Sequence, residues 1–285
     1  MAEQAQKKRK LTWQDCKKMK QQGEKIVMLT AYDFSAATLA EAAGVDVLLV
    51  GDSLGNVVLG YDTTLQVTMA DMIHHTKPVV RGAQNTLVIT DMPFGSYEVS
   101  PEQAVANAIR IIKEGGCDGV KLEGGNEQRL AAISAITAAN VPVVGHLGLT
   151  PQRIIQLGGF KVQGKTNAAA QAIIDEAKAL EAAGAVMIVL ECIPAVLAEA
   201  ITAAVSIPTI GIGAGAGCDG QVLVWYDMVG MYDGFQPKFV KHFAEAGQVI
   251  CQGMAAYVAE VKAGSFPAAE HTFAMAEKEE LKKLY

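Results

Sequence analysis

The sequence is poor in aromatic residues and has no paired cysteine motif, and both shortages narrow the kind of protein it encodes. Phe, Trp and Tyr make up 6% of the 285 residues, whereas hydrophobic residues make up 51%. The five cysteines form no Cys-x-x-Cys pair and show no metal-ligand spacing. Because this pattern is typical of reduced thiols, we expect a cytoplasmic protein without a disulfide framework or a cysteine-based metal site.

Long apolar runs and an extended basic surface are also missing. No stretch approaches the roughly 20 uncharged residues that span a bilayer, and no apolar segment follows the basic run at 7–10 as it would in a signal peptide. The formal net charge is -6, with both signs spread along the chain. We therefore expect neither a membrane nor a nucleic acid as partner.

The sequence does contain a repeated alternation of short Val-, Ile- and Leu-rich runs with Ala-rich stretches of helical spacing. This alternation is typical of a parallel sheet with covering helices. It favours an α/β fold, a (β/α)8 TIM barrel with an N-terminal helix and a C-terminal helical extension over 239–262, above a doubly wound sheet. The eight expected strands are 26–30, 45–50, 86–90, 119–122, 142–145, 186–190, 208–212 and 221–224.

One of the expected helices has a recognisable start, and a similar start occurs in the loop expected after the fifth strand. In Ser100-Pro101-Glu102 the serine can accept a hydrogen bond from a free N–H, the proline suits the first helical position, and the glutamate favours the positive end of the helix dipole. Thr150-Pro151 predicts a second start of the same kind. The expected helices are 35–43, 69–82, 101–115, 127–140, 167–184 and 194–205.

The length is compatible with a single domain, which we expect to extend over 1–285 with flexible or peripheral tails at 1–10 and 274–285. Neither an internal repeat nor a low-complexity linker divides the chain. Long loops are expected after the second and fifth strands, at 53–68 and 147–166. In a barrel these loops would cover the face at which active sites are built.

Ionisable residues follow five of the apolar runs, where a parallel barrel brings them to one rim. A single acid at a strand end is commonly a turn or capping residue, but four on one rim would repel one another in poorly solvated surroundings. A hard divalent cation such as Mg²⁺, which prefers oxygen ligands, would offset that cost. The five residues are Asp52, Asp91, Glu123, His146 and Glu191.

Three of the rim positions allow more than one interpretation. Lys121 lies two residues before Glu123 on one strand, so both side chains face inward; they can form a structural salt bridge, or the lysine can hold a substrate carboxylate or enolate oxygen. Glu191 has apolar neighbours that suit a proton-accepting base; the alternative is a supporting or capping acid. His146, in a Gly-His-Leu-Gly turn, is either structural or catalytic.

The glycine-rich run at 211–217 partly imitates a dinucleotide-binding fingerprint. It lies late in the chain, and another expected strand follows it instead of a helix. We interpret these glycines as positions where the backbone packs closely against a neighbour, in preference to a phosphate-binding cup.

Several motifs, taken in order, resemble those of the ketopantoate hydroxymethyltransferase (3-methyl-2-oxobutanoate hydroxymethyltransferase) family from about Leu11 to His271, and together they are highly specific. They are MLTAYD at 28–33, LLVGDSLGNVVLGYDTTLQVT at 48–68, TDMPFGSY at 90–97, VKLEGG at 120–125, GHLGLTPQ at 145–152, GGFKVQGKT at 158–166, VLECIP at 189–194 and GIGAGAGCDGQVLVWYD at 211–227.

The resemblance implies an enzyme that transfers a hydroxymethyl group from 5,10-methylenetetrahydrofolate to 3-methyl-2-oxobutanoate, giving 2-dehydropantoate for pantothenate biosynthesis through a Mg²⁺-stabilised enolate. It also implies a homo-oligomer, expected to be a decamer. By resemblance the Mg²⁺ ligands are Asp52, Asp91 and Glu123, the substrate-binding residues are Asp52, Ser53, Asp91, Lys121 and His146, and the catalytic base is Glu191.

Two other functions stay open at this point. The first is a metal-dependent 2-oxo acid lyase or mutase of the phosphoenolpyruvate mutase and isocitrate lyase type, which a nucleophilic cysteine in an active-site loop would favour; Cys192, between the proposed base and Ile193-Pro194, is no obvious counterpart. The second is a catalytically silent barrel that serves as a binding protein, which would bind no divalent metal.

Overall fold

The protein forms a closed barrel of parallel strands in a computed structural model that describes residues 9–232, 234 and 236–274. Each strand pairs with the next in chain order, and the last pairs with the first. This confirms the (β/α)8 barrel and excludes the doubly wound sheet. The strands are β1 (Ile26–Thr30), β2 (Val47–Val50), β3 (Leu87–Asp91), β4 (Gly119–Glu123), β5 (Val143–Gly148), β6 (Met187–Glu191), β7 (Thr209–Ile212) and β8 (Gly220–Leu223).

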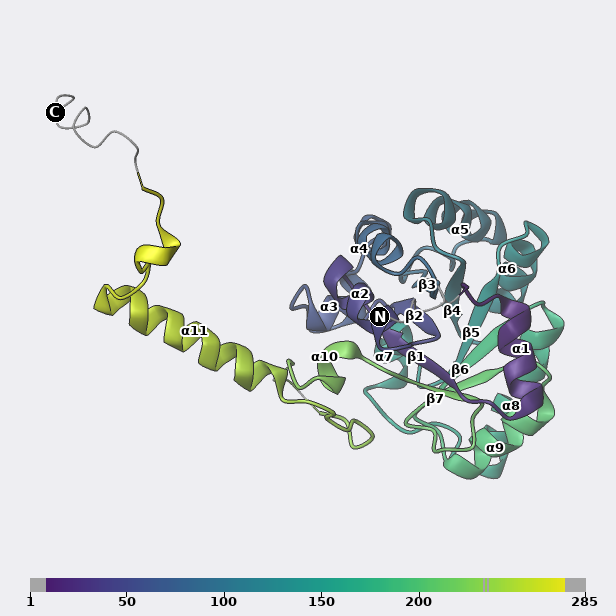
Figure 1. The fold of residues 1–285 in the computed structure, drawn as a ribbon. Helices are drawn as coiled ribbons and strands as arrows, with labels where there is room; N and C mark the ends of the chain where they lie inside the picture. Colours follow the sequence, from purple (N-terminus) through teal and green to yellow (C-terminus); the bar gives the residue numbers. More distant parts are fainter. Residues whose placement is uncertain (1–8, 233, 235, 275–285) are drawn as a thin grey trace.

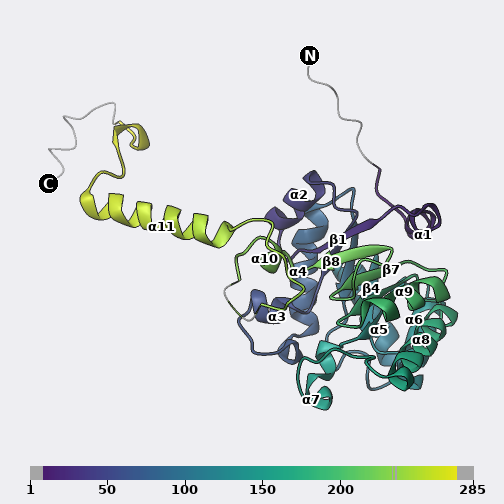
Figure 2. The same cartoon turned by 90° about the horizontal axis from the view of Figure 1, so that it is seen from below.

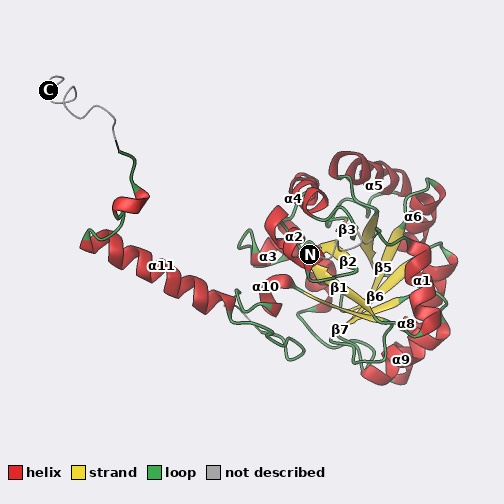
Figure 3. Ribbon diagram, viewed as in Figure 1, coloured by secondary structure: helices red, strands yellow, loops and turns green. Residues whose placement is uncertain are grey.

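Helices form a ring around the strands (Figure 1, and in red in Figure 3). The N-terminal helix and all six expected helices are present. Short helices interrupt the two expected long loops. The helices are α1 (Trp13–Gln22), α2 (Phe34–Ala42), α3 (Leu54–Val57), α4 (Met69–Gly82), α5 (Pro101–Gly115), α6 (Glu127–Ala138), α7 (Ile154–Leu157), α8 (Asn167–Ala182), α9 (Ala195–Ala204), α10 (Trp225–Met228) and α11 (Ala246–Ala263), with 3-10 turns η1 (Thr64–Gln66), η2 (Pro151–Arg153) and η3 (Ala269–His271).

The two predicted helix starts have different outcomes. Ser100 caps α5, since its side chain accepts a hydrogen bond from the backbone N–H of Gln103. The start predicted at Thr150-Pro151 is confirmed in position only. The 3-10 turn η2 begins at Pro151 and leads into α7, but Thr150 forms no side-chain cap, and its buried hydroxyl has no hydrogen-bond partner among the described residues.

The barrel interior is apolar at its lower end. Alternate strand residues such as Met28, Leu49 and Ile89 point inward and pack in one buried cluster with Cys16 and Met19 of α1. Helix α1 therefore closes the N-terminal end of the barrel. Polar side chains are left to occupy the C-terminal end, where barrel active sites lie.

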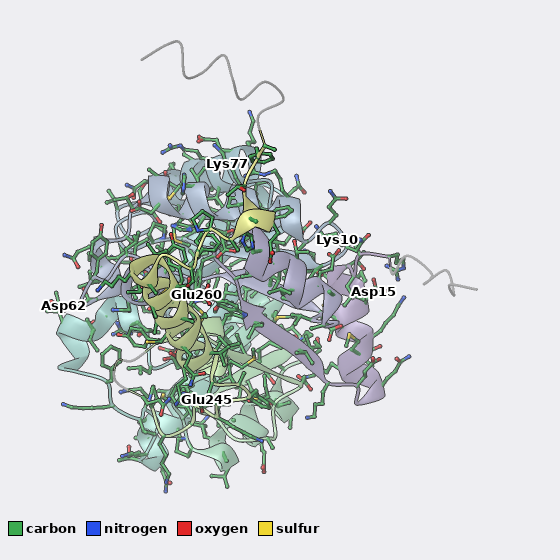
Figure 4. The ribbon with its side chains drawn as sticks, turned by 60° about the vertical axis from the view of Figure 1, so that its left-hand side comes forward. Lys10, Asp15, Asp62, Lys77, Glu245 and Glu260 are labelled. Atoms are coloured by element: carbon green, nitrogen blue, oxygen red, sulfur yellow. The ribbon has the colours of Figure 1, made fainter. Side chains whose placement is uncertain are left out.

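Helix α11 confirms the expected C-terminal helical extension but begins later than expected, at Ala246 and not at 239. Phe239 instead lines the cavity described below. Figures 1 and 2 show α11 projecting away from the barrel, and none of its residues is buried. In Figure 4 the side of the molecule that carries α11 is turned toward the viewer, with Glu245 at the N-terminal end of the helix and Glu260 near its C-terminal end.

The structure describes only a few residues of the two predicted tails. The tails predicted at 1–10 and 274–285 lie outside the described residues, apart from Arg9, Lys10 and Ala274. Of those, Lys10 forms an ion pair with Asp118. No helix among the residues described is both long and apolar enough to cross a membrane.

Because Ser100 caps a helix and Thr150 does not, removing the two hydroxyls should affect the free energy of unfolding differently. Ser100→Ala removes a side-chain cap and should lower the free energy of unfolding by about 1 kcal/mol. Thr150→Val removes an unpaired buried hydroxyl at nearly constant shape and should leave that free energy unchanged or slightly raised. Urea unfolding at one fixed protein concentration measures both values. A loss at Thr150 as large as that at Ser100 would contradict the assignment of the caps.

Candidate active site

The strand pleat and register bring the expected polar residues together. Asp91, Lys121, Glu123 and His146 continue the inward-facing alternation of their strands, so all four point into the barrel above its apolar layers. The register pairs Asp91 with Lys121 and Glu123 with His146 on neighbouring strands. Glu191 ends β6 on the same face.

All seven expected site residues line one cavity of about 470 Å³ at the C-terminal end of the barrel. Most of them are almost inaccessible: the exposed fraction is 5% for Asp52, 3% for Asp91, 4% for Lys121 and 2% for Glu123. The mouth of the cavity is lined by residues from the loops, including Phe160 and Phe239. The seven residues are Asp52, Ser53, Asp91, Lys121, Glu123, His146 and Glu191.

The Lys121 ammonium lies at the centre of the charged groups. Its Nζ is 3.0 Å from Oδ1 of Asp91 and 3.2 Å from Nδ1 of His146. Burial acts to lower the pKa of Lys121, but the charges of Asp91, Glu123 and Asp52 outweigh it and raise the pKa above its ordinary value. The lysine therefore stays charged, and its ion-pair partner is Asp91 on the neighbouring strand, not Glu123 two residues further on.

His146 lies between two carboxylates. Its Nδ1 is 3.3 Å from Oε1 of Glu123, and its Nε2 is 3.2 Å from Oε2 of Glu191. Burial and the Lys121 ammonium act to lower the pKa of His146, but the two carboxylates raise it on balance to about 9. The same contact with His146 outweighs burial at Glu123 and lowers the pKa of that carboxyl. The imidazole thus links Glu123 to Glu191 as a cation at neutral pH.

Asp52 is held from two sides. Its backbone N–H donates to Oδ2 of Asp91 at 2.9 Å, and its own Oδ2 accepts from the Gln152 amide at 2.8 Å. Burial, and then the charges of Asp91 and Glu123, raise the pKa of Asp52 to about 8. Next to it, the Ser53 hydroxyl is 2.8 Å from the Tyr32 hydroxyl.

The backbone around Glu191 tolerates few substitutions. Cys192, the next residue, has a left-handed φ of 48°, which is uncommon for a residue other than glycine. Opposite it, Gly148 has a φ of 94°, and a Cβ there would lie 2.2 Å from the carbonyl oxygen of Glu191. Burial raises the pKa of the Cys192 thiol to about 12, so this cysteine is a poor nucleophile.

The donor set suits a divalent cation at two of the three expected ligands. The carboxylates of Asp52 and Asp91 are both buried, and burial together with the charges of Asp91 and Glu123 raises the pKa of Asp52, a cost that a bound cation would relieve. Glu123 differs, because Oε1 contacts His146 and Oε2 accepts from the backbone N–H of Gln152. Consistent with this, no group of three His, Cys, Asp or Glu side chains in the described part of the chain forms a ready metal cluster.

The sequence interpretation missed Gln152 and Tyr97, which support the acids from behind. Gln152 contacts both Asp52 and Glu123, and the Tyr97 hydroxyl accepts a hydrogen bond from the backbone N–H of Glu123. Both residues fall inside the conspicuous motifs GHLGLTPQ and TDMPFGSY. An amide and a phenol at loop positions carry no spacing signal of their own.

The glycines of the 211–217 run pack against protein, as the sequence interpretation expected. A Cβ on Gly213 would lie 2.7 Å from the Phe239 ring, one on Gly215 would lie 2.5 Å from Cβ of Ala195, and one on Gly217 would meet the Glu199 side chain. The loop between β7 and β8 is therefore compact because it lacks side chains at these points.

Comparisons with known proteins agree with the resemblance in the motifs. The family model described as ketopantoate hydroxymethyltransferase matches residues 10–269. A 3-methyl-2-oxobutanoate hydroxymethyltransferase from Heliobacterium modesticaldum is 56% identical over 278 residues, covering 97% of this chain and 99% of the relative. One from Clostridium novyi is 59% identical, covering 94% and 97%.

Solved structures with a similar fold are more distant in sequence. A phosphonopyruvate hydrolase complexed with oxalate and Mg²⁺ has a TM-score of 0.59 and 12% identity, covering 96% of this chain and 95% of that one. A 2,3-dimethylmalate lyase, a member of the phosphoenolpyruvate mutase and isocitrate lyase superfamily, has a TM-score of 0.57 and 14% identity, covering 95% and 97%. At such identities the likeness supports the barrel fold alone.

The position of His146 between two carboxylates predicts its titration. In the metal-free protein its ring should lose its proton near pH 9, whereas an ordinary histidine does so near 6.5. Because the folded-state pKa is raised, the stability this histidine contributes is complete below pH 6.5 and is lost as the pH rises through about 9. NMR of ¹³Cε1-labelled histidines, with His146→Gln for assignment, measures it. A His146 signal that titrates near 6.5 would contradict this electrostatic description.

Proposed function

The chain belongs to the ketopantoate hydroxymethyltransferase family, and from this premise we propose that it transfers a hydroxymethyl group from 5,10-methylenetetrahydrofolate to 3-methyl-2-oxobutanoate. The product is 2-dehydropantoate, in pantothenate biosynthesis. The observation that carries the proposal is one cavity that contains a buried ammonium, the buried carboxylates of Asp52 and Asp91 and, beside His146, a further carboxylate. These groups match the needs of a reaction through an enolate.

Lys121 and Ser53 are proposed to bind the 2-oxo acid, with Asp52, Asp91 and His146 beside it. The ammonium of Lys121 attracts the substrate carboxylate or the developing enolate oxygen, and the Ser53 hydroxyl, held by Tyr32, donates or accepts a hydrogen bond. Holding both ends of the oxo acid fixes C3 relative to the incoming one-carbon unit. The apolar lower barrel excludes water from below.

Mg²⁺ is the proposed metal, with Asp52 and Asp91 as its ligands and Glu123 acting through a water. When bound, the cation would supply positive charge that stabilises negative charge at the keto oxygen of the substrate. Glu123 suits the indirect role because both of its carboxylate oxygens already have protein contacts.

Glu191 is the proposed base. It removes the proton from C3 of 3-methyl-2-oxobutanoate. One of the two C–N bonds of the folate methylene bridge breaks, with its electron pair passing to nitrogen, and the electron pair left at C3 forms the new C–C bond to the methylene carbon. Hydrolysis of the bond between that carbon and the folate nitrogen then releases 2-dehydropantoate and tetrahydrofolate. His146, 3.2 Å from Glu191, holds the carboxylate in one orientation for the proton transfer.

A lyase or mutase reaction has less support. Such an enzyme would be favoured by a reactive loop cysteine. Among the described residues that line the cavity the one cysteine is Cys192, which is half-buried with a raised thiol pKa. The lyases and mutases that share the barrel are 12–18% identical to this chain, far below the hydroxymethyltransferases.

Hydrogen exchange at C3 tests the proposed chemistry without the folate. The protein, Mg²⁺ and 3-methyl-2-oxobutanoate are incubated in D₂O, and loss of the C3 proton signal is followed by NMR. Glu191→Gln should slow this exchange by about 10²–10⁴-fold, because the variant lacks the proton acceptor. Chelation of the metal should also abolish exchange in the wild type.

A matched control is Glu199→Gln, which makes the same change on the outer helix α9, away from the cavity lining. It should exchange at the wild-type rate. Exchange that is unaffected by Glu191→Gln would refute the assigned base. If the wild type shows no metal-dependent exchange with or without folate, the proposed function fails.

We propose that the protein forms a homo-oligomer, with a decamer as the expected size, and that α11 makes the contact between copies. This helix is about 27 Å long by its residue count. It exposes Ile250, Met254, Tyr257 and Val261 along one face, each more than 40% accessible. A projecting helix with such an apolar face has little reason to be stable in water unless another copy covers it.

The five free thiols support the proposed cytoplasmic location.

A charge on that face should disrupt the assembly. Met254→Lys is expected to shift the sedimentation coefficient to smaller species, whereas Gln252→Lys, on the opposite side of α11, should leave it unchanged. Analytical ultracentrifugation compares each with ten copies of the 30.1 kDa chain. A monomeric wild type, or variants that sediment alike, would argue against α11 as the contact.

A further inference from the structure

The side chain of Gln152, which is 4% exposed, is fully hydrogen-bonded behind the charged groups of the cavity. Its Nε2 donates to Oδ2 of Asp52 at 2.8 Å and to the carbonyl oxygen of Met92 at 3.0 Å. Its Oε1 accepts from the Tyr97 hydroxyl at 2.5 Å. Its backbone N–H donates to Oε2 of Glu123 at 3.0 Å. One residue thus joins the acid after β2 to the acid at the end of β4.

The partners allow one orientation of the Gln152 amide. The Tyr97 oxygen accepts the backbone N–H of Glu123 at 3.2 Å, and its own proton is directed at Gln152. The Met92 carbonyl can only accept, so it must face the NH₂ end of the amide. The Arg129 guanidinium, 4.8 Å above the Tyr97 ring, packs on the phenol and fixes its position. Reversal of the amide would place an oxygen against both Asp52 and Met92.

A neutral donor suits this position better than a cation. Asp91 already has the Lys121 ammonium 3.0 Å away, which offsets part of its charge. A second cation at Asp52 would cancel the charge with which that carboxylate attracts a metal ion. An amide instead fixes the carboxylate plane and leaves its full charge in place.

From this arrangement we propose that Gln152, oriented by Tyr97, is a positioning residue for metal binding: it holds Oδ2 of Asp52 so that the other oxygen faces the cavity. The inference rests on the proposed metal site and deepens it. Loss of a partner that orients a metal ligand typically weakens metal binding about 10–100-fold.

The test measures binding of Mn²⁺ to the full-length protein, with no substrate, by titration followed in the EPR signal of free Mn²⁺. Tyr97→Phe removes only the hydroxyl that orients the amide, and Gln152→Met removes the amide at similar length. Each should raise the Kd of Mn²⁺ at least about tenfold. The EPR spectrum of the bound ion should also change in both variants, because one ligand is no longer fixed.

A control for lost stability is Thr76→Val. It removes a buried hydroxyl that bonds Met72 and Thr90 between α4 and β3, outside the cavity lining. It should lower the melting temperature without altering the Kd of Mn²⁺. If it weakens Mn²⁺ binding as much as Tyr97→Phe does, the effect is general loosening and the inference is overturned.

The double variant distinguishes a chain of contacts from two separate effects. Since Tyr97 acts through Gln152, adding Tyr97→Phe to Gln152→Met should change the Kd no further, whereas independent effects would multiply. If both single variants bind Mn²⁺ with the same Kd as the wild type, this inference is overturned while the proposed metal site still stands. Absence of Mn²⁺ binding by the wild type would contradict both.

Discussion

The ion pair between Lys121 and Asp91 is the interaction on which the site depends. Four carboxylates at the end of an apolar barrel would repel one another strongly without a cation among them. The Lys121 ammonium, with the protonated His146 ring beside it, offsets two of the four negative charges. What remains, if all four acids are ionised, equals the charge of one divalent cation. With all four acids ionised, the charge of the cavity would match the Mg²⁺ that the proposed mechanism requires.

Two different contacts keep the proposed metal ligands, Asp91 and Asp52, in place. Asp91 is held by a charge, Lys121, which belongs to the neighbouring strand and reaches it through the register of β3 and β4. Asp52 lies just beyond β2 and is held by the neutral amide of Gln152 from the loop after β5. The contact between Lys121 and Asp91 follows from the pleat of the barrel strands. The contact between Gln152 and Asp52 needs a loop that folds back over the rim, and Tyr97 and Arg129 keep Gln152 in one orientation.

The sequence predicted the fold and the cavity lining well, because both follow from periodicity. Alternation along each strand is enough to point Lys121, Glu123 and His146 to the same interior, and parallel strands bring their ends to one rim. It could not predict that Lys121 pairs with Asp91, because register depends on tertiary packing. Gln152 escaped notice because its importance comes from a fold-back of 29 and 100 residues in sequence toward Glu123 and Asp52. The side-chain cap expected at Thr150 is absent although the helical turn begins where Thr150-Pro151 predicts it, and the local sequence does not distinguish this hydroxyl from the capping hydroxyl of Ser100.

Transfer of labelled carbon tests the proposed reaction most directly. The protein is supplied with Mg²⁺, 3-methyl-2-oxobutanoate and tetrahydrofolate carrying a ¹³C-methylene group, and the products are followed by ¹³C NMR. We predict that the label appears in the hydroxymethyl group of 2-dehydropantoate, and that Lys121→Met, which removes the central cation, abolishes its appearance. Label that stays on the folate while the oxo acid is cleaved or left unchanged would contradict hydroxymethyl transfer.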